Sequence, residues 1–165
     1  MKLRALEEKD LSFVHELNNT QSIMSYWFEE PYQSLSELKY LFNKHVLDEA
    51  ERRFIIEDDD KTVAGIVELV EINYIHRNCE IQIIVKPEFS GKGFAQFGFK
   101  EAIDYAFNIL NMHKIYLYVD VDNKKATHIY EKLGFEIEGL LKEHFYTKGQ
   151  YKSAYLMSLL KTNHS

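Results

Sequence analysis

Two spacings of hydrophobic residues divide this chain into strands and helices. Short apolar or alternating stretches bounded by turn residues are typical of strands, whereas apolar residues three and four positions apart indicate amphipathic helices. Strands are predicted at residues 3–6, 53–57, 63–73, 79–85, 114–119, 135–146 and 151–160. Helices are predicted at residues 11–18, 34–46, 94–110 and 123–133.

Local signals mark the ends of the predicted helices. Asp10 and Asn123 are expected to cap the first and last helices, because short polar side chains accept hydrogen bonds from the free N–H groups there. Ser34 followed by Glu37 is a capping-box pattern. Gly134 is expected to end the last helix. Residues 25–31 show no clear period, which predicts a loop or a broken helix.

The order of elements predicts the fold class. A strand, two helices, three strands, a helix, a strand, a helix and two strands indicate an α/β domain with a mixed, mostly antiparallel central sheet flanked by helices. A doubly wound parallel sheet would need repeated βαβ units, and only the centre of this chain supplies one. With 165 residues, 45% of them hydrophobic, residues 1–165 suit a single domain with its own core.

Composition excludes several classes of protein. No apolar run approaches the roughly 18 residues of a membrane span, and the first residues lack the apolar run of a secretion signal. A net charge of −6 argues against general nucleic-acid binding. Cys79 is the single cysteine, so no internal disulfide can form. We therefore expect a cytoplasmic protein without membrane or nucleic-acid partners.

Acidic residues are concentrated in the first half of the chain. Residues 1–80 carry 17 acidic and 9 basic side chains, against 9 and 11 in residues 81–165. The ordinary interpretation is a solvated acidic face. The alternative is that the first half attracts a cationic substrate while the second half holds an anionic cofactor. The segment 58–61 is expected to be a hairpin turn.

A glycine-rich turn is the clearest candidate for chemistry. Ser90, Gly91, Lys92, Gly93, Phe94 and Ala95 follow the apolar run at 80–85 and open a predicted helix. Free N–H groups and the helix dipole at such a turn suit a pyrophosphate. Many tight turns need glycine for other reasons. The turn therefore predicts a phosphate-bearing cofactor only together with the rest of the chain.

The turn and the segment 123–135 together resemble the acetyl-CoA site of the Gcn5-related N-acetyltransferase family. Gly93 and Ala95 match the family's Gln/Arg-x-x-Gly-x-Gly/Ala turn, whereas Ser90 stands where Gln or Arg is usual. This departure removes one polar anchor and leaves the backbone N–H groups. Within the family, the bacterial spermidine/spermine N-acetyltransferases are the most similar branch. The stretches that carry this closer likeness are 18–19, 23–32, 51–54 and 71–77.

The resemblance implies the acyl-CoA N-acyltransferase fold and transfer of acetyl from acetyl-CoA to a primary amine of spermidine or spermine. It makes Tyr130 the proton donor to the departing thiolate, although Tyr130 could be merely a packed aromatic residue. The base stays open among Glu29, Glu71 and Glu80, acting directly or through water. The implied cofactor-binding residues are Ile83, Ile84, Val85, Ser90, Gly91, Lys92, Gly93, Phe94, Ala95, Gln96, Asn123, Lys125 and Tyr130.

The resemblance also implies an allosteric polyamine site at a subunit interface of a dodecamer. The implied substrate-binding residues, that site included, are Met24, Glu29, Glu37, His45, Leu47, Asp48, Glu51, Glu80, Ile81 and Gln82. The helix at 34–46 could instead present a simple solvated acidic side. A divalent cation such as Mg²⁺ is implied between Glu29 and Glu71, although two carboxylates make an incomplete site.

Two other functions stay open. The chain could acetylate a different amine, such as a protein N-terminus or an amino sugar. It could also be a non-catalytic sensor of polyamines or CoA. An intact Tyr130 and a complete 123–135 segment favour an enzyme over a sensor.

Overall fold

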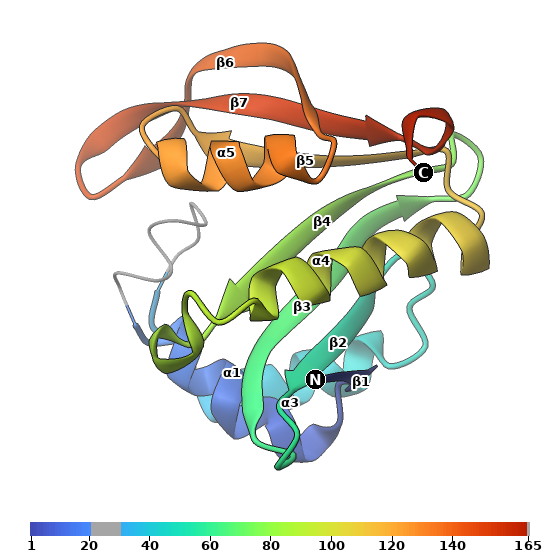
Figure 1. The fold of residues 1–165 in the computed structure, drawn as a ribbon. Coiled ribbons are helices and arrows are strands. Elements are labelled where there is room, and N and C mark those ends of the chain that lie inside the picture. The colour runs from blue at the N-terminus through green and yellow to red at the C-terminus, as the bar shows by residue number, and fades with distance from the viewer. Residues whose placement is uncertain (21–30, 165) are drawn as a thin grey trace.

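The computed structural model, which describes residues 1–20 and 31–164, contains one seven-stranded sheet with helices on both faces (Figure 1). The strand order is β1-β2-β3-β4-β5-β7-β6. The strands are β1 Lys2–Ala5, β2 Arg52–Glu57, β3 Val63–Asn73, β4 Asn78–Val85, β5 Lys114–Asp120, β6 Glu136–Thr147 and β7 Gln150–Leu160. The helices are α1 Leu11–Asn18, α3 Leu35–His45, α4 Phe94–Asp104 and α5 Lys124–Lys132.

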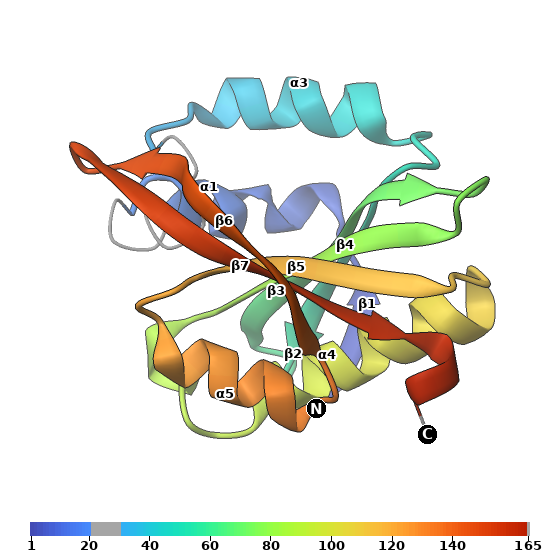
Figure 2. The same ribbon diagram turned by 90° about the horizontal axis from the view of Figure 1, so that it is seen from above.

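Only the β4–β5 pair is parallel among the strand pairs of the described residues, because α4 connects these two strands. Helices α1 and α3 lie on one face of the sheet, and α4 and α5 lie on the other (Figure 2). The mixed, mostly antiparallel α/β fold predicted from the sequence is therefore confirmed. Among the described residues, no helix is long and apolar enough to cross a membrane.

Most of the predicted helix ends are confirmed. Ser34 Oγ accepts a hydrogen bond from the backbone N–H of Glu37, and Asn123 Oδ1 accepts one from Ala126. Gly134 follows α5 with a left-handed φ of +97°. Residues 21–30 lie outside the described part, so the loop expected at 25–31 is described only at Pro31.

Three local predictions need correction. Asp10 makes no capping hydrogen bond at α1, because its carboxylate is held by Arg4 and by the N–H of Glu7. The helix expected to reach residue 110 is α-helical to Asp104 and then forms a π-helical turn, Tyr105–Ile109. The glycine turn does not follow β4 directly, because the 3-10 turn Pro87–Phe89 lies between them.

A buried ion network joins the start of the chain to the sheet edge. The Arg4 guanidinium donates to both carboxylate oxygens of Asp10, at 2.7 and 2.8 Å, and also pairs with Glu57 of β2. Asp10 is only 4% exposed. Burial alone would raise the pKa of Asp10, but the hydrogen bonds from Arg4 and the Glu7 N–H bring it below its usual value. Arg4 therefore pairs with two carboxylates that the fold removes from water.

Alternation along β4 separates the two faces of the sheet. Cys79, Ile81 and Ile83 are buried in the large core under α4 and α5. Ile84 instead packs with the smaller core, formed by Phe13, Leu17, Ile55 and Ile66. Because successive side chains point to opposite faces, Glu80 and Gln82 share the α1 and α3 face with Ile84. This face carries the polar residues of the candidate site.

Candidate active site

The parallel strands β4 and β5 separate after three residue pairs. Their pairing begins at Asn78 with Lys114 and ends at Glu80 with Tyr116. Residues 81–85 remain paired with β3 on their other side. The two strands diverge from this point toward the glycine turn (Figure 1). The open edge of β4 therefore offers backbone N–H and C=O groups to an extended ligand, as in strand addition. Ile83, Ile84 and Val85, predicted to bind the cofactor, lie along this edge.

The glycine turn leads from the open strand edge into α4. Gly91 and Gly93 have left-handed φ values of +74° and +86°, and Gly93 occupies the N-cap position of α4. The first N–H groups of an α-helix have no intrahelical acceptor, so they can donate to a phosphate. Ser90, Gly91, Lys92, Gly93 and Gln96 are exposed, Ala95 is half-buried, and Phe94 is buried in the core. Phe94 can therefore offer a ligand its backbone but not its side chain.

Replacing Gly93 by alanine tests whether this turn holds the cofactor. Among residues 1–20 and 31–164, the only atom near an added Cβ is Met1 Cε, at 3.9 Å, so the penalty is conformational rather than steric. We expect a stability loss of about 1–2 kcal/mol from the left-handed φ and a KM for acetyl-CoA about tenfold higher, measured by steady-state kinetics, since a displaced amide loses roughly one charge-assisted hydrogen bond.

Gly149 provides the matched control, because it has a comparable φ of +78° in the β6–β7 turn with nothing within 4 Å of its Cβ. Gly149→Ala should cost similar stability and leave the KM for acetyl-CoA unchanged. Equal effects of both substitutions on that KM would contradict a cofactor role for the glycine turn.

Tyr130 lies on α5 and faces the core beneath α4 and α5. Its ring makes edge contacts with Phe99 of α4 at 5.3 Å and with Phe135 at 6.3 Å. It is 9% exposed and shares one core cluster with Ile83 and Leu117, which border the opening of the sheet. Burial raises the pKa of Tyr130 to about 12. The phenol is therefore both a packed ring and a group that keeps its proton at neutral pH.

The N-terminal end of α5 carries two other predicted cofactor residues. Asn123 is half-buried and its side chain is used to cap the helix, whereas Lys125 is exposed. The helix N-terminus and Lys125 contribute positive potential where an anionic ligand is expected. In the described residues, no ion pair engages Lys125.

Glu80 and Gln82 lie on the opposite face of β4 from Tyr130's core contacts. Gln82 Nε2 donates to Glu80 Oε1 at 2.9 Å. Ile81 is buried on the α4 side, so only its backbone can contact an acceptor. Glu71 is exposed at a bulge of β3, with a φ of +51°. The charges of Glu80 and Glu71 both contribute to raising the pKa of Tyr116, after the larger effect of burial. Two of the three candidate bases, Glu80 and Glu71, therefore lie near Tyr116.

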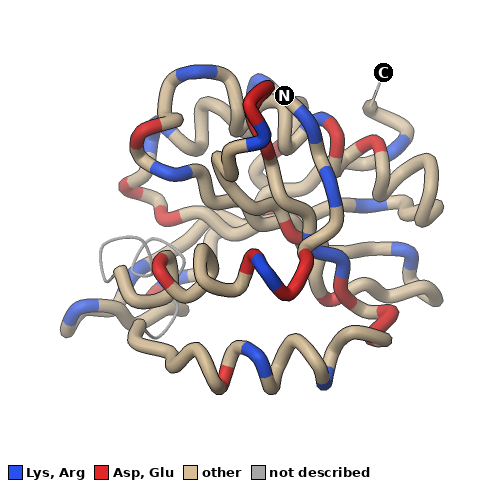
Figure 3. The backbone as a smooth tube through the Cα atoms, turned by 90° about the horizontal axis from the view of Figure 1, so that it is seen from below, with Lys and Arg blue, Asp and Glu red and all other residues tan. Residues whose placement is uncertain are grey.

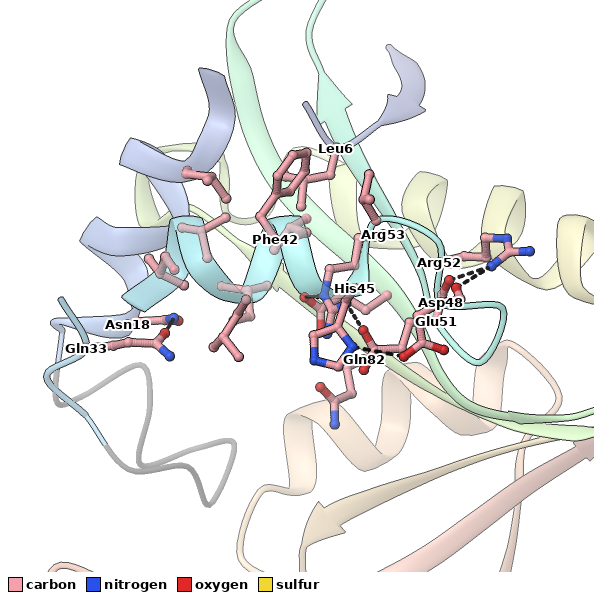
Figure 4. A pocket seen from close by; sticks show the side chains of 18 of the residues that line it. Leu6, Asn18, Gln33, Phe42, His45, Asp48, Glu51, Arg52, Arg53 and Gln82 are labelled. Atoms are coloured by element: carbon pink, nitrogen blue, oxygen red, sulfur yellow. Dashed lines mark hydrogen bonds and ion pairs between the residues drawn. The ribbon is translucent and has the colours of Figure 1, made fainter. Parts of the chain in front are cut away.

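A cavity of about 870 Å³ lies between α3, α1 and the sheet (Figure 4). Most of the predicted polyamine-binding residues line it, namely Glu37, His45, Leu47, Asp48, Glu51 and Gln82. Leu38, Leu41 and Phe42 of α3 supply apolar walls. Of the other four predicted residues, Glu80 and Ile81 do not line the cavity, and Met24 and Glu29 lie outside the described residues. The cavity therefore combines separated carboxylates with apolar surface, which matches cationic groups on alkyl spacers.

Acidic groups gather at one end of this cavity. His45 Nδ1 lies 2.9 Å from Asp48 Oδ2, and Glu51 forms an ion pair with Arg53. The ligand atoms of His45, Asp48 and Glu51 all lie within 4.8 Å of one another, so they could receive an ammonium group or a divalent cation. Hydrogen bonds from the Ala50 N–H and from His45 lower the pKa of Asp48. Asp48 is therefore ionised at neutral pH.

Helix α3 itself does not have an acidic side. It carries Glu37 together with Lys39 and Lys44, so a red segment is followed by blue ones along it (Figure 3). The acidic residues of this region follow the helix, in the segment 48–51. A solvated acidic helix face does not describe this arrangement.

Sequence reasoning missed four residues of this face, namely Arg53, Glu68, Tyr116 and Tyr118. Arg53 bridges Glu51 and Glu68, with Nε 3.1 Å from Glu68 Oε1, and Tyr116 and Tyr118 border the sheet opening. The signal was present in the alternation of the predicted strands, because Tyr116 and Tyr118 are two residues apart. The facing residues on neighbouring strands, however, depend on a register that the local pattern does not give.

The predicted metal pair is only half described. Glu71 is exposed, and Glu29 lies outside the described residues. A single carboxylate falls short of the six or more oxygen ligands typical of a divalent cation. The Glu29–Glu71 cation site stays a prediction, and no chemical step depends on it.

Comparisons with known proteins agree with this geometry. A family described as "Acetyltransferase (GNAT) domain" matches residues 1–136. The spermidine N(1)-acetyltransferase of Vibrio cholerae is 56% identical over 164 residues, covering 99% of this chain and 95% of the relative. That of Escherichia coli K12 is 52% identical over 161 residues, covering 98% and 86%. The solved Vibrio cholerae spermidine N-acetyltransferase in complex with CoA and spermine has a TM-score of 0.96 at 56% identity, covering 98% of this chain and 96% of that chain.

Proposed function

This chain belongs to the GNAT acetyltransferase family, and from that premise we propose that it transfers the acetyl group of acetyl-CoA to a primary amine of spermidine or spermine. The observation that carries the proposal is the 56% identity to a spermidine N(1)-acetyltransferase over 99% of this chain. The opened sheet edge, the glycine turn and the acidic cavity supply the kinds of surface that this reaction needs.

The reaction is proposed to proceed by direct attack in a ternary complex. When bound, acetyl-CoA supplies the acetyl thioester. The backbone of Ile83, Ile84 and Val85 would hold an extended arm, and the turn 90–96, with Asn123 and Lys125 on α5, would face its phosphates. Tyr130 keeps its phenolic proton because its pKa is about 12. It therefore has a proton to give to the departing thiolate as the carbon–sulfur bond breaks.

The acceptor must be a neutral amine when it attacks the thioester. A free alkylammonium has a pKa of roughly 10.4, so one proton has to leave before attack. A nearby carboxylate holds the cation but also raises the pKa of the amine, which opposes deprotonation. Proton loss through an ordered water to Glu80, Glu71 or Glu29 would relieve this conflict. The choice among these three bases stays open.

We further propose that the cavity beneath α3 is a regulatory polyamine site at a subunit interface of a dodecamer. Its supporting features are Glu37, Asp48 and Glu51 on apolar walls and the outward-facing Leu47, which is 90% exposed. An exposed leucine of this kind suits a partner subunit better than water. The proposal includes one acetyltransferase domain spanning residues 1–165 and a cytoplasmic location, which the single cysteine fits.

A thiol-release assay tests the reaction, the acceptor and the cooperativity together. Spermidine, spermine, a peptide with a free N-terminus and an amino sugar are each supplied with acetyl-CoA, and free CoA thiol is followed over a range of acceptor concentrations. Release with both polyamines and a sigmoidal dependence are expected. Preference for the peptide or the sugar would contradict the polyamine assignment. Polyamine binding without thiol release would indicate a sensor.

Glu37→Gln tests the regulatory cavity. Glu37 lines the cavity, and among the described residues no ion pair engages its side chain, so its loss leaves no orphaned cation. We expect the spermidine concentration at half-maximal velocity to rise about 3- to 10-fold, the effect of roughly one charge-assisted hydrogen bond. Glu101→Gln, at an exposed position of α4, is the control. A Glu37 variant with unchanged sigmoidal kinetics would remove the cavity from regulation.

A further inference from the structure

Two tyrosines of β5 border the place where the sheet opens. Tyr116 faces Glu80 in the last β4–β5 pair, and Tyr118 lies two residues farther, along the gap. Ile115, Leu117 and Val119 are buried in the core under α4 and α5. Because alternate residues point to opposite faces, both tyrosines point to the face that carries Glu80, Gln82 and the α3 cavity.

The two rings continue into a row of aromatic side chains. Tyr116 and Tyr118 make an edge contact with ring centroids 6.0 Å apart, and Tyr118 makes another with Phe145 of β6 at 5.7 Å. All three side chains are half-buried, and none belongs to either core cluster of the described residues. Aromatic side chains that neither fill the core nor lie freely in water form a surface suited to an apolar ligand.

Carboxylates lie close to this row. Burial first, and then the negative charge of Glu80, raise the pKa of Tyr116 to about 12. The same two causes raise the pKa of Tyr118, with Glu71 contributing. Both phenols are therefore neutral at neutral pH. Neutral rings beside Glu80 and Glu71 can attract an ammonium group through their faces while the carboxylates attract it by charge.

Resting on the proposed function, we propose that Tyr116 and Tyr118 form the aromatic wall of the acceptor cleft and make it selective for polyamines over monoamines. The reactive amine would lie at the apex between Glu80 and Tyr116. The next ammonium of the polyamine would lie against Tyr118, since two residues of a strand span about 6.6 Å, comparable with a propyl or butyl spacer. A monoamine has no second ammonium for this ring.

The aromatic wall also addresses the conflict between holding and deprotonating the amine. Carboxylates raise the pKa of a bound amine, whereas removal of water by aromatic surface lowers it. An amine between Glu80 and Tyr116 experiences both effects. The wall therefore favours binding of the distal charge without retaining the proton on the attacking nitrogen.

Tyr118→Leu and Tyr118→Phe separate an aromatic wall from simple apolar volume. We expect Tyr118→Leu to lower kcat/KM for spermidine about tenfold, the typical effect of one partly desolvated cation–π contact, and to leave kcat/KM for butylamine and the KM for acetyl-CoA unchanged. Tyr118→Phe keeps the ring and should keep the selectivity. Tyr118→Met, which also removes the ring, serves as a second variant if Tyr118→Leu does not fold. Tyr116→Leu should lower kcat/KM for both amines, because the reactive amine is placed against Tyr116.

Tyr146→Leu, an exposed position in the β6–β7 hairpin, is the control and should retain wild-type selectivity. Thermal unfolding and CoA binding are measured on every variant. Unchanged selectivity in folded Tyr118→Leu or Tyr118→Met, or an equal loss with both amines in these variants, would overturn the assignment. Failure of the wild-type protein to acetylate any polyamine would instead overturn the proposed function itself, and with it this inference.

Discussion

Tyr130→Phe is expected to lower kcat about 10²- to 10³-fold, within the range that loss of a general acid produces. The substitution removes only the phenolic oxygen. The ring and its edge contacts with Phe99 and Phe135 are retained. The KM for acetyl-CoA should therefore change little, and thermal stability should be close to wild type. Single-turnover kinetics with saturating acetyl-CoA and spermidine measures the chemical step directly.

The pH dependence gives this prediction a second readout. Because the pKa of Tyr130 is about 12, the wild-type enzyme keeps its donor protonated throughout the neutral and mildly alkaline range. Any loss of activity between pH 8 and pH 10 must then come from another group. Tyr105→Phe is the matched control, since Tyr105 is a partly buried ring that packs against Phe54 away from the sheet opening. Full turnover by Tyr130→Phe would remove Tyr130 as the donor.

Arg4→Met should destabilise the fold by about 3–5 kcal/mol, the usual effect of removing one partner from a buried ion pair. The loss is a large fraction of a typical stability of roughly 5–15 kcal/mol. Asp10 and Glu57 would remain buried without their cation. Urea unfolding at pH 7, followed by circular dichroism, measures the change. Lys152→Met, at an exposed pair with Asp122, should cause a much smaller loss, because water screens such a pair.

The sign of the pH effect follows from the lowered pKa of Asp10. In the wild-type protein the folded-state pKa is below the unfolded value, so Asp10 stabilises the fold above the unfolded pKa of roughly 3.9. This contribution disappears as the pH falls through the folded-state pKa. In Arg4→Met, burial raises the pKa of Asp10 because Arg4 no longer opposes this effect. Protonation of Asp10 at lower pH then removes the buried charge that destabilises the variant. The difference in free energy of unfolding between wild type and Arg4→Met should shrink from pH 7 toward pH 4. A constant difference would contradict the network.

Helix caps show which features of the fold local sequence can predict. The caps at Ser34 and Asn123 and the stop at Gly134 were predictable because each depends on hydrogen bonds or dihedral angles within three or four residues. Asp10 follows the same local rule yet does not cap. Arg4, which the pairing of β1 with β2 also places beside Glu57, offers its carboxylate a stronger partner.

The candidate site divides in the same way. The glycine turn and the 123–135 segment were found from the chain itself, since their small residues and spacing are properties of short segments. Arg53 was missed because its two partners, Glu51 and Glu68, meet it only through the β2–β3 register. Tyr116 and Tyr118 were missed because strand alternation alone does not say which neighbours face them.

Periodicity and capping act over a few residues, so the chain alone was enough to predict the elements and most of their ends. Its short motifs also indicated the family and the turn expected to hold the cofactor. Only the tertiary structure decided that β4 and β5 separate after Glu80 and Tyr116, and that acidic groups from the segment 48–51 and from β4 share one face with aromatic rings of β5. The physical reason is that strand register and helix placement are set by burial across the whole sheet, where residues distant in the chain exclude water together.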